Sequence, residues 1–351
     1  MSILVTGGCG FIGSNFILEW FSESDEKLIN LDKLSYAASK ENLNSISNKK
    51  NFISIEGDIG DSEIVDHLLN KYRPNTIINF AAETHVDRSI ENPISFFENN
   101  IMCTIKLLEG VKKHFQNKPD LEKTSFKFIQ VSTDEVYGSL DISENAFTEG
   151  SKYQPNSPYS ASKASSDHIV RSYFQTYNIP TIITNCSNNY GPYQYPEKLI
   201  PLVINNILNE KKIPVYGSGE NIRDWLYVKD HCRALIMIIK NGRLGETYNI
   251  GGNEEHRNID VIKKVCNIMA EIKSLPHNNF YNLLSYIEDR PGHDFRYAIN
   301  STKINKEIGW KPKYSFDNGL YKTVNWYLSN TKWLEKATNS DYQNWVKNHY
   351  K

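Results

Sequence analysis

The chain has 351 residues, of which 39% are hydrophobic and 23% charged, and its formal net charge is −1. These values are typical of a globular protein with a sizeable core, in one large domain or two smaller ones. The near-zero charge gives no reason to expect nucleic acid or a membrane surface as a partner. No apolar run is long enough to span a bilayer, and Ile3-Leu4-Val5 leads directly into glycines, which predicts no signal peptide.

The five cysteines are odd in number, scattered along the chain and never arranged as Cys-x-x-Cys. This usage predicts neither a disulfide framework nor a zinc site, and we expect no metal. Buried, inert thiols in a reducing cytoplasm are the expected state.

Short apolar runs alternate with longer amphipathic stretches in the first half of the chain. The runs are rich in Ile, Val, Phe and Thr, which predicts largely buried strands at Ile3–Thr6, Lys27–Leu31, Phe52–Glu56, Thr76–Phe80, Phe126–Ser132 and Thr181–Asn185. Helices are predicted between most of them, as at Ser62–Lys71, Pro93–Phe115 and Ser160–Tyr177. Such alternation predicts a doubly wound α/β domain over residues 1–185, with a parallel sheet of Rossmann type and right-handed crossovers.

The pattern changes after about Asn185, where the loops lengthen and strands and helices mix. The predicted strands are Pro214–Tyr216, Thr247–Ile250 and Ser285–Glu288, and the predicted helices are Lys198–Asn209, Lys229–Lys240 and Ile259–Glu271. We expect residues 186–351 to form mainly a smaller mixed α/β cap that binds the substrate, with some segments returning to the first domain.

A glycine-rich turn, Gly7-Gly8-Cys9-Gly10-Phe11-Ile12-Gly13, follows the first predicted strand and opens a helix. It satisfies Gly-x-Gly-x-x-Gly, whose glycines allow a tight turn, close approach of the backbone to a pyrophosphate and close packing of helix on strand. The N–H groups of the helix N-terminus then face the anion. The turn therefore predicts a dinucleotide cofactor, held by Gly7, Gly10, Phe11, Ile12 and Gly13.

Acidic residues follow the second and third predicted strands, at the edge where open α/β sheets bind ligands. Asp32 stands where a carboxylate meets the adenosine ribose hydroxyls. Because it would repel a 2′-phosphate, NAD is favoured over NADP, although the adjacent Lys33 weakens this inference. Asp58, with Ile59, is expected beside adenine or, alternatively, as a helix N-cap. Other residues at this edge are Ala81, Ala82, Thr133 and Asn188.

Tyr159-x-x-x-Lys163 lies at the start of a predicted helix, and its i, i+4 spacing places both side chains on one helical face. A nearby ammonium lowers the pKa of a phenol. The resulting phenolate can take a proton from a substrate hydroxyl while hydride leaves the same carbon. After a dinucleotide fingerprint, the pair predicts a hydride-transfer site, whereas alone it would indicate an exposed helical pair.

Thr133-Asp134-Glu135 follows the fifth predicted strand. Two adjacent carboxylates beside a hydride site suit an elimination, because one can protonate a leaving hydroxyl while the other removes a carbon-bound proton. This division requires surroundings that separate the two pKa values and raise that of the acid. A solvated acidic loop is the alternative.

Together these motifs resemble those of the extended short-chain dehydrogenase/reductase superfamily and, within it, the dTDP-glucose 4,6-dehydratase family. The resemblance covers nearly the whole chain. It is carried by Thr133-Asp134-Glu135, by residues 79–89, 185–192, 196–201 and 222–228, and by Asp289-Arg290-Pro291-Gly292-His293-Asp294.

The resemblance implies an NAD-dependent lyase that oxidises the glucose of dTDP-glucose at C4, eliminates water across C5 and C6, and returns the hydride to C6. The product would be dTDP-4-dehydro-6-deoxyglucose. By the same resemblance, Tyr159 deprotonates the C4 hydroxyl, whose oxygen Thr133 helps to hold. Glu135 removes the C5 proton and Asp134 protonates the departing C6 hydroxyl. NAD undergoes no net change, so we expect it to stay bound between turnovers.

A nucleotide-sugar site is also implied. Arg223, which is planar and permanently charged, is expected at the diphosphate. His85 is expected to have a structural or hydrogen-bonding role rather than to act as a general base. The remaining expected substrate-binding residues are Asp87, Ser89, Asn188, Lys198, Leu199, Tyr216, Asn258, Asp289, Arg290, His293 and Tyr297.

The resemblance further implies a homodimer packed through two helices of each subunit, for which Pro93–Phe115 and Ser160–Tyr177 are candidates, although their apolar residues could equally be core. Two alternative functions remain open. One is another nucleotide-sugar 4,6-dehydratase or a 4-epimerase, for example on a UDP-sugar. The Asp134–Glu135 pair argues against an epimerase, which needs no acid for C6. The other is a non-catalytic protein that senses NAD.

Overall fold

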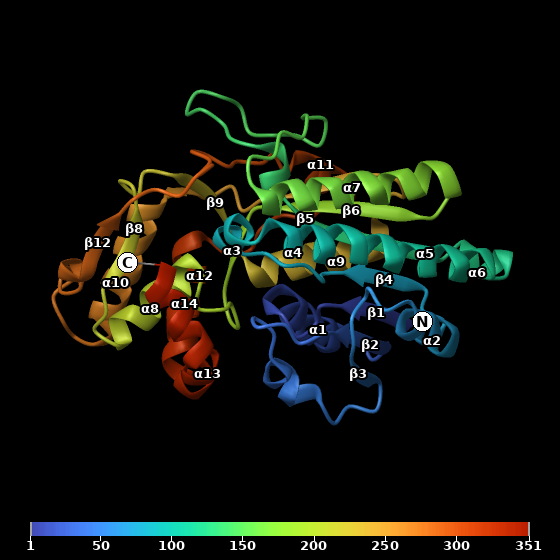
Figure 1. Ribbon diagram of the computed structural model, residues 1–351, viewed down its shortest axis with the longest axis horizontal. Helices are drawn as coiled ribbons and strands as arrows, with labels where there is room; N and C mark the ends of the chain where they lie inside the picture. Colours follow the sequence, from blue (N-terminus) through green and yellow to red (C-terminus); the bar gives the residue numbers. More distant parts are fainter. Residues whose placement is uncertain (1, 350–351) are drawn as a thin grey trace.

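The computed structural model of the protein describes residues 2–349, and a seven-stranded parallel sheet forms its centre (Figure 1). The strand order is β3-β2-β1-β4-β5-β6-β10, so the chain starts inside the sheet, builds to one edge and then crosses to the other. This reversal opens a crevice at the carboxyl ends of the strands. The strands are β1 (Ser2–Thr6), β2 (Lys27–Asp32), β3 (Phe52–Glu56), β4 (Thr76–Asn79), β5 (Lys127–Thr133), β6 (Thr181–Cys186) and β10 (Thr247–Ile250).

The predicted doubly wound α/β fold is confirmed, and the first six strands lie within one residue of their predicted bounds. Their apolar runs are recognisable because the sheet is covered on both faces. β6, for example, is buried at every position, and β5 at every position except the first.

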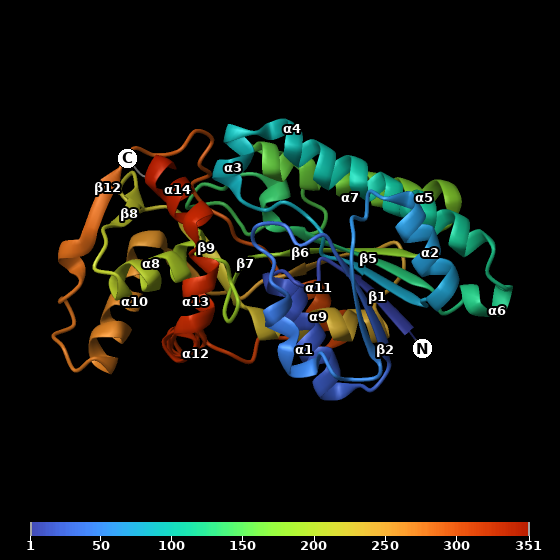
Figure 2. The same ribbon diagram turned by 60° about the horizontal axis from the view of Figure 1, so that its bottom comes forward.

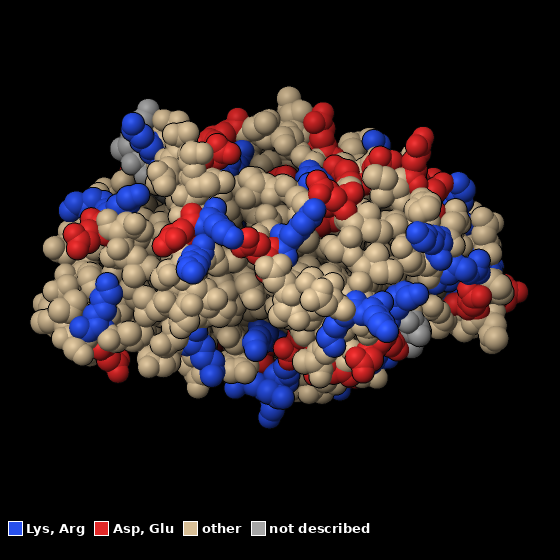
Figure 3. Space-filling view, turned by 90° about the horizontal axis from the view of Figure 1, so that it is seen from below, with Lys and Arg blue, Asp and Glu red and all other residues tan. Residues whose placement is uncertain are grey.

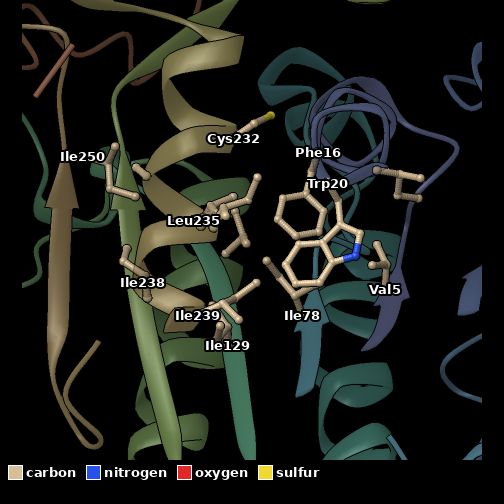
Figure 4. Close-up of a cluster of buried hydrophobic side chains, with 14 of the residues drawn as sticks. Val5, Phe16, Trp20, Ile78, Ile129, Cys232, Leu235, Ile238, Ile239 and Ile250 are labelled. Carbon is tan, nitrogen blue, oxygen red and sulfur yellow. The ribbon is translucent and has the colours of Figure 1, made fainter. Parts of the chain in front are cut away.

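Helices cover both faces of the sheet. On one face, Phe16 and Trp20 of α1 and Leu235 of α9 form a hydrophobic cluster with Val5 and Ile129 of the strands (Figure 4). On the other face, α2, α5 and α7 pack through a second buried cluster. The bounds are α1 (Phe11–Glu23), α2 (Ser62–Tyr72), α5 (Cys103–Gln116), α7 (Pro158–Tyr177) and α9 (Val228–Asn241).

Two elements predicted for the cap belong to the first domain instead. Thr247–Ile250 is β10, which pairs in parallel with β6, and Lys229–Lys240 lies within α9, which packs against α1. A strand of four residues carries no sign of its partner, so its place in the main sheet depends on tertiary packing that the local pattern does not encode.

The predicted helix Pro93–Phe115 is interrupted. It divides into α4 (Pro93–Phe96), a π-helical segment η2 (Phe97–Met102) and α5. Within η2 the buried Asn100 accepts a hydrogen bond from Glu83 N–H at 2.8 Å and donates one to Glu83 O at 2.9 Å. The irregular turn thus ties the helix to the loop after β4, and such π-bulges are frequent at functional sites.

The cap lies beyond the carboxyl ends of the main strands (Figures 1 and 2). It contains a three-stranded sheet, a parallel strand pair and three helices around a hydrophobic core of its own. Its elements are β7 (Asn188–Tyr190), β8 (Ile213–Tyr216), β9 (Ile222–Tyr227), β11 (Glu255–Arg257), β12 (Leu284–Ile287), α8 (Leu199–Leu208), α10 (Asn258–Ile272) and α12 (Phe316–Ser329).

Two C-terminal helices, α13 (Thr331–Ala337) and α14 (Ser340–His349), lie at the junction of the two parts (Figures 1 and 2). Trp333 Nε1 donates to Asn42 Oδ1 of the first domain at 2.8 Å, and Tyr342 Oη donates to Pro196 O at 3.1 Å. The other short elements are η1 (Lys40–Ile46), α3 (Val86–Glu91), α6 (Asp120–Lys123), η3 (Asp134–Tyr137), η4 (Tyr281–Leu283) and α11 (Thr302–Ile308).

Acidic and basic side chains are interspersed over the face shown in Figure 3. All five cysteines are free thiols, and four of them are buried. Within residues 2–349, no helix combines the length and apolarity needed to cross a bilayer, and no cluster of potential metal ligands is found.

Candidate active site

A deep cavity runs along the carboxyl ends of the main strands and extends to the cap. Its lining comes from strand ends and the loops that follow them, which places the site where the topology of the sheet predicts it. Among the residues expected from sequence, the lining includes Gly7, Gly10, Phe11, Ile12, Gly13, Asp32, Lys33, Asp58, Ile59, Ala81, Ala82, Thr133, Asp134, Glu135, Tyr159, Lys163, Asn188 and Lys198.

The glycine-rich turn is a backbone cradle with no room for side chains. Gly7 has φ of +70°, and a Cβ there would lie 2.7 Å from Ala81 N. A Cβ on Gly13 would lie 2.3 Å from Gly7 O. Gly10, the N-cap of α1, supplies no capping side chain, so N–H groups of the first turn remain available to an anion. These features fit the pyrophosphate of a dinucleotide.

Asp32 is 7% exposed and holds the loop after β2 through its backbone contacts. Its carboxylate accepts hydrogen bonds from Cys9 N–H at 2.8 Å and Leu34 N–H at 2.7 Å, while burial raises its pKa. Lys33 Nζ lies 3.9 Å from Asp58 and 3.8 Å from Glu83, so the neighbouring ammonium is already balanced by two carboxylates. This end of the cavity therefore disfavours an additional phosphate.

Tyr159 and Lys163 lie one turn apart on α7, whose N-terminus is fixed by a capping box between Ser157 and Ser160. Both side chains are buried, and Lys163 Nζ donates to Val131 O at 2.8 Å. Burial, reinforced by the negative charge of Glu135, raises the pKa of Tyr159 well above its ordinary value. Desolvation is the largest influence on this pKa, and Lys163 is not among the main ones.

Asp167, one further turn along α7, is a site residue that the sequence analysis missed. It accepts hydrogen bonds from Ser132 Oγ at 2.6 Å and Tyr153 Oη at 3.3 Å. Burial raises its pKa to about 7, and the charge of Lys163 opposes that rise. Asp167 is therefore the counter-charge to the buried ammonium. An acid four residues after Lys163 is the signal that could have identified it.

Asp134 and Glu135 open the 3₁₀ helix η3 directly after β5. Thr133 caps this helix, since its hydroxyl accepts a hydrogen bond from Glu135 N–H at 3.3 Å. Asp134 is 1% exposed, and its Oδ2 has no hydrogen-bond partner among residues 2–349. Burial, with the nearby Glu135 and Asp224 carboxylates, raises the pKa of Asp134 well above its ordinary value.

The surroundings of Glu135 are different. Burial also raises its pKa, but Arg290, Lys198 and Arg223 all oppose that rise. Three cations thus lower the pKa of Glu135, whereas Arg223 is the one cation among the main influences on the pKa of Asp134. The two adjacent carboxyls therefore have the unequal surroundings that separate an acid from a base.

The three residues expected near the sugar, His85, Asp87 and Ser89, all form polar contacts within the protein. His85 caps α3, where its Nδ1 accepts from Arg88 N–H at 3.4 Å, and burial lowers its pKa to about 4. Ser89 Oγ accepts from Tyr159 N–H at 3.2 Å and so positions the start of α7. Asp87 accepts from Tyr216 Oη at 3.0 Å and pairs with Arg290 at 3.1 Å.

Among the expected nucleotide-sugar residues from the second half of the chain, Asn188 and Lys198 line the cavity and the others do not. The Arg223 guanidinium lies 4.3 Å from the ring centre of Tyr297 and donates to Asp294 O at 2.9 Å. His293 Nδ1 lies 2.6 Å from Asp289 Oδ1. Lys198, which lines the cavity, donates to Thr84 O at 2.7 Å. Leu199 and Asn258 begin α8 and α10 and do not line the cavity.

Comparison with known proteins gives one consistent result. The family model described as GDP-mannose 4,6 dehydratase matches residues 4–323. The dTDP-glucose 4,6-dehydratase of Shigella flexneri is 48% identical, with 100% of this chain and 99% of the relative covered. A Bacillus anthracis dTDP-glucose 4,6-dehydratase solved in complex with NAD is 44% identical, with a TM-score of 0.85 over 96% of this chain and 99% of that chain. A UDP-glucose 4-epimerase from Thermotoga maritima is 27% identical, with a TM-score of 0.82 over 94% of this chain and 100% of that chain.

The Gly13→Ala variant should bind NAD at least about tenfold more weakly than the wild type, because the new Cβ would meet backbone atoms of Gly7 and Gly8 that cannot move aside. Isothermal titration calorimetry on cofactor-stripped protein would measure this. Gly150→Ala is the control, since its Cβ would meet only Thr148 Oγ1 at 3.8 Å. Wild-type affinity in Gly13→Ala would contradict the cradle.

Proposed function

The chain belongs to the dTDP-glucose 4,6-dehydratase family, and we propose that it converts dTDP-glucose into dTDP-4-dehydro-6-deoxyglucose and water at the cavity described above. The observation that carries the proposal is the pair of adjacent carboxyls Asp134 and Glu135, which line the cavity with Tyr159 and Lys163 and of which Asp134 is buried. NAD, which the glycine-rich turn and Asp32 would hold, would supply the hydride acceptor for C4 of the glucose and the hydride donor for C6.

Tyr159 is the group that removes the proton of the C4 hydroxyl. The Thr133 side chain is close enough to lower the pKa of this phenol, and both groups line the cavity, so one substrate oxygen can contact both. A phenolate in this buried position needs a positive charge nearby, and Lys163 supplies it one helical turn away. Asp167 in turn keeps that ammonium charged.

Asp134 and Glu135 divide the elimination between them. Asp134, whose pKa burial and the nearby Glu135 and Asp224 carboxylates raise well above its ordinary value, retains its proton and delivers it to the departing C6 oxygen. Glu135, beside three cations, is the carboxylate that removes the C5 proton, which the ketone at C4 has made acidic. The assignment follows from the two environments, because sequence adjacency alone would allow either order.

The cap residues account for recognition of the nucleotide sugar. Arg223 presents a stacked, fully buried guanidinium to the diphosphate, and Arg290 and Lys198 add positive charge on the same side of Glu135. The other residues of this proposed site are Asn188, Leu199, Tyr216, Asn258, Asp289, His293 and Tyr297. His85, Asp87 and Ser89 support it through their contacts within the protein.

The direct test is incubation of the purified, NAD-loaded protein with dTDP-glucose and, separately, with UDP-glucose. We expect a 4-keto-6-deoxy product and loss of water with dTDP-glucose. A 4-epimer without water loss, or no 4-keto product from dTDP-glucose, would contradict the proposal. Dehydration of UDP-glucose alone would indicate a dehydratase acting on another nucleotide.

Asp134→Asn should slow water loss by roughly 10²–10⁴-fold and C4 oxidation much less, because the lost proton is needed only when the C6 oxygen departs. Rapid mixing in a single turnover would follow reduced cofactor and final product separately, and reduced cofactor should accumulate. The control is Asp141→Asn, which changes an exposed carboxylate on the following loop. An equal slowing of both steps would contradict the role of Asp134.

We also propose that the protein is a homodimer packed through the helices of residues 93–116 and α7. These helices carry exposed apolar side chains, namely Ile94 at 66%, Met102 at 50% and Tyr177 at 42%. Analytical ultracentrifugation should give twice the 40.4 kDa of one chain, and Met102→Glu should shift the protein toward monomer. A monomer at micromolar wild-type concentration would overturn the proposal.

A further inference from the structure

Arg88, in the middle of α3, contacts two aromatic rings from distant parts of the chain. Its guanidinium lies 4.0 Å from the ring centre of Tyr36, in the loop after β2, and 4.5 Å from that of Trp345 in α14. The helices α3 and α14 lie side by side in both ribbon views (Figures 1 and 2). Two cation–π contacts of one guanidinium thus join these segments.

Glu197 completes the arrangement. Arg88 Nε donates to Glu197 Oε2 at 2.9 Å, and Tyr36 Oη donates to Glu197 Oε1 at 2.7 Å. The Glu197 side chain is 1% exposed, so its charge depends on these partners. We call Tyr36, Arg88, Glu197 and Trp345 the Arg88 clamp.

The clamp joins two walls of the cofactor cavity. Ser35, Ala37 and Ala38, which flank Tyr36, line one wall. Glu197 and the nearby Tyr195 line another wall. The rings of Tyr36 and Tyr195 meet edge to face, with their centres 5.5 Å apart. Arg88 does not line the cavity; it lies behind the place where these walls meet. The clamp therefore bridges walls that would have to separate for a large ligand to leave.

We propose that the Arg88 clamp is a latch that keeps NAD in the cavity between turnovers, so that Arg88 is a positioning residue for cofactor retention. This inference rests on the proposed function, in which the cofactor ends each cycle unchanged and never needs to be released. In such an enzyme every opening of the cavity risks loss of the cofactor. The Arg88–Glu197 ion pair, together with the rings of Tyr36 and Trp345, makes opening rare.

The test compares NAD retention in Arg88→Met and wild-type protein. Both are loaded with NAD and passed through a desalting column, and the nucleotide per chain is measured over time after denaturation. We expect Arg88→Met to lose NAD at least about tenfold faster, because both the ion pair and the cation–π contacts are removed. Retention equal to that of the wild type would overturn the proposal.

Arg233→Met is a matched control. Arg233 pairs with Asp230 at 2.6 Å, and the two side chains are 17% and 1% exposed, against 24% and 1% for Arg88 and Glu197. This pair lies on α9, away from the cavity lining. We expect wild-type retention of NAD in this variant. Equal loss of NAD in both variants would assign the effect to general destabilisation and overturn the latch.

Tyr36 provides a second route if Arg88→Met does not fold. It is 38% exposed, so its replacement disturbs little core. Tyr36→Phe keeps the ring over Arg88 and should speed NAD loss less than Tyr36→Ala does. Wild-type retention in Tyr36→Ala would overturn the proposal.

Isotope transfer separates the latch from the reaction itself. With dTDP-glucose labelled at C4, wild-type protein should carry the label to C6. Arg88→Met, supplied with unlabelled NADH, should release part of the label as free reduced cofactor and form some 4-keto product without label at C6. If wild-type protein lost NAD as fast as the variant, the latch would be overturned. Formation of the 4-keto product by that same protein would still support the proposed reaction.

Discussion

The withdrawal of ionisable side chains from water at one edge of the sheet is the constraint on which the rest of this structure depends. Asp134, Tyr159 and Lys163 are 1%, 7% and 4% exposed. A buried charge is costly unless it is paired or neutralised. The structure meets this cost in two ways: Lys163 has Val131 O and the counter-charge of Asp167, whereas Asp134 lacks a strong cationic partner and favours its neutral form.

The cap contributes to the chemistry as well as to recognition. The three cations that act on Glu135 come from β9, from the residue before α8 and from the loop after β12. They oppose the rise of the Glu135 pKa, and of the three only Arg223 is among the main influences on the pKa of Asp134. The difference between two adjacent carboxyls therefore depends on the cap being seated over the strand ends. The helices α13 and α14 and the Arg88 clamp join the cap to the first domain at this junction.

Local patterns were sufficient to predict the parallel sheet, the glycine cradle and the Tyr159–Lys163 pair, because each is encoded within one strand, turn or helix. They were insufficient where contacts between distant segments decide the outcome. β10 joins the main sheet through β6, and Asn100 is turned inward by bonds to Glu83. Arg88 meets Tyr36 and Trp345 only in the folded chain. The raised pKa of Tyr159 likewise results from burial, which no spacing reveals.

The central claim is that unequal surroundings keep Asp134 protonated when Glu135 is ionised. Infrared difference spectroscopy of NAD-loaded wild-type protein across a pH titration tests it directly, with Asp134→Asn and Glu135→Gln used to assign the carboxyl bands. The account predicts that, as pH rises, Glu135 loses its proton first and the Asp134 band persists at neutral pH. Ionisation of Asp134 at a lower pH than Glu135 would contradict it.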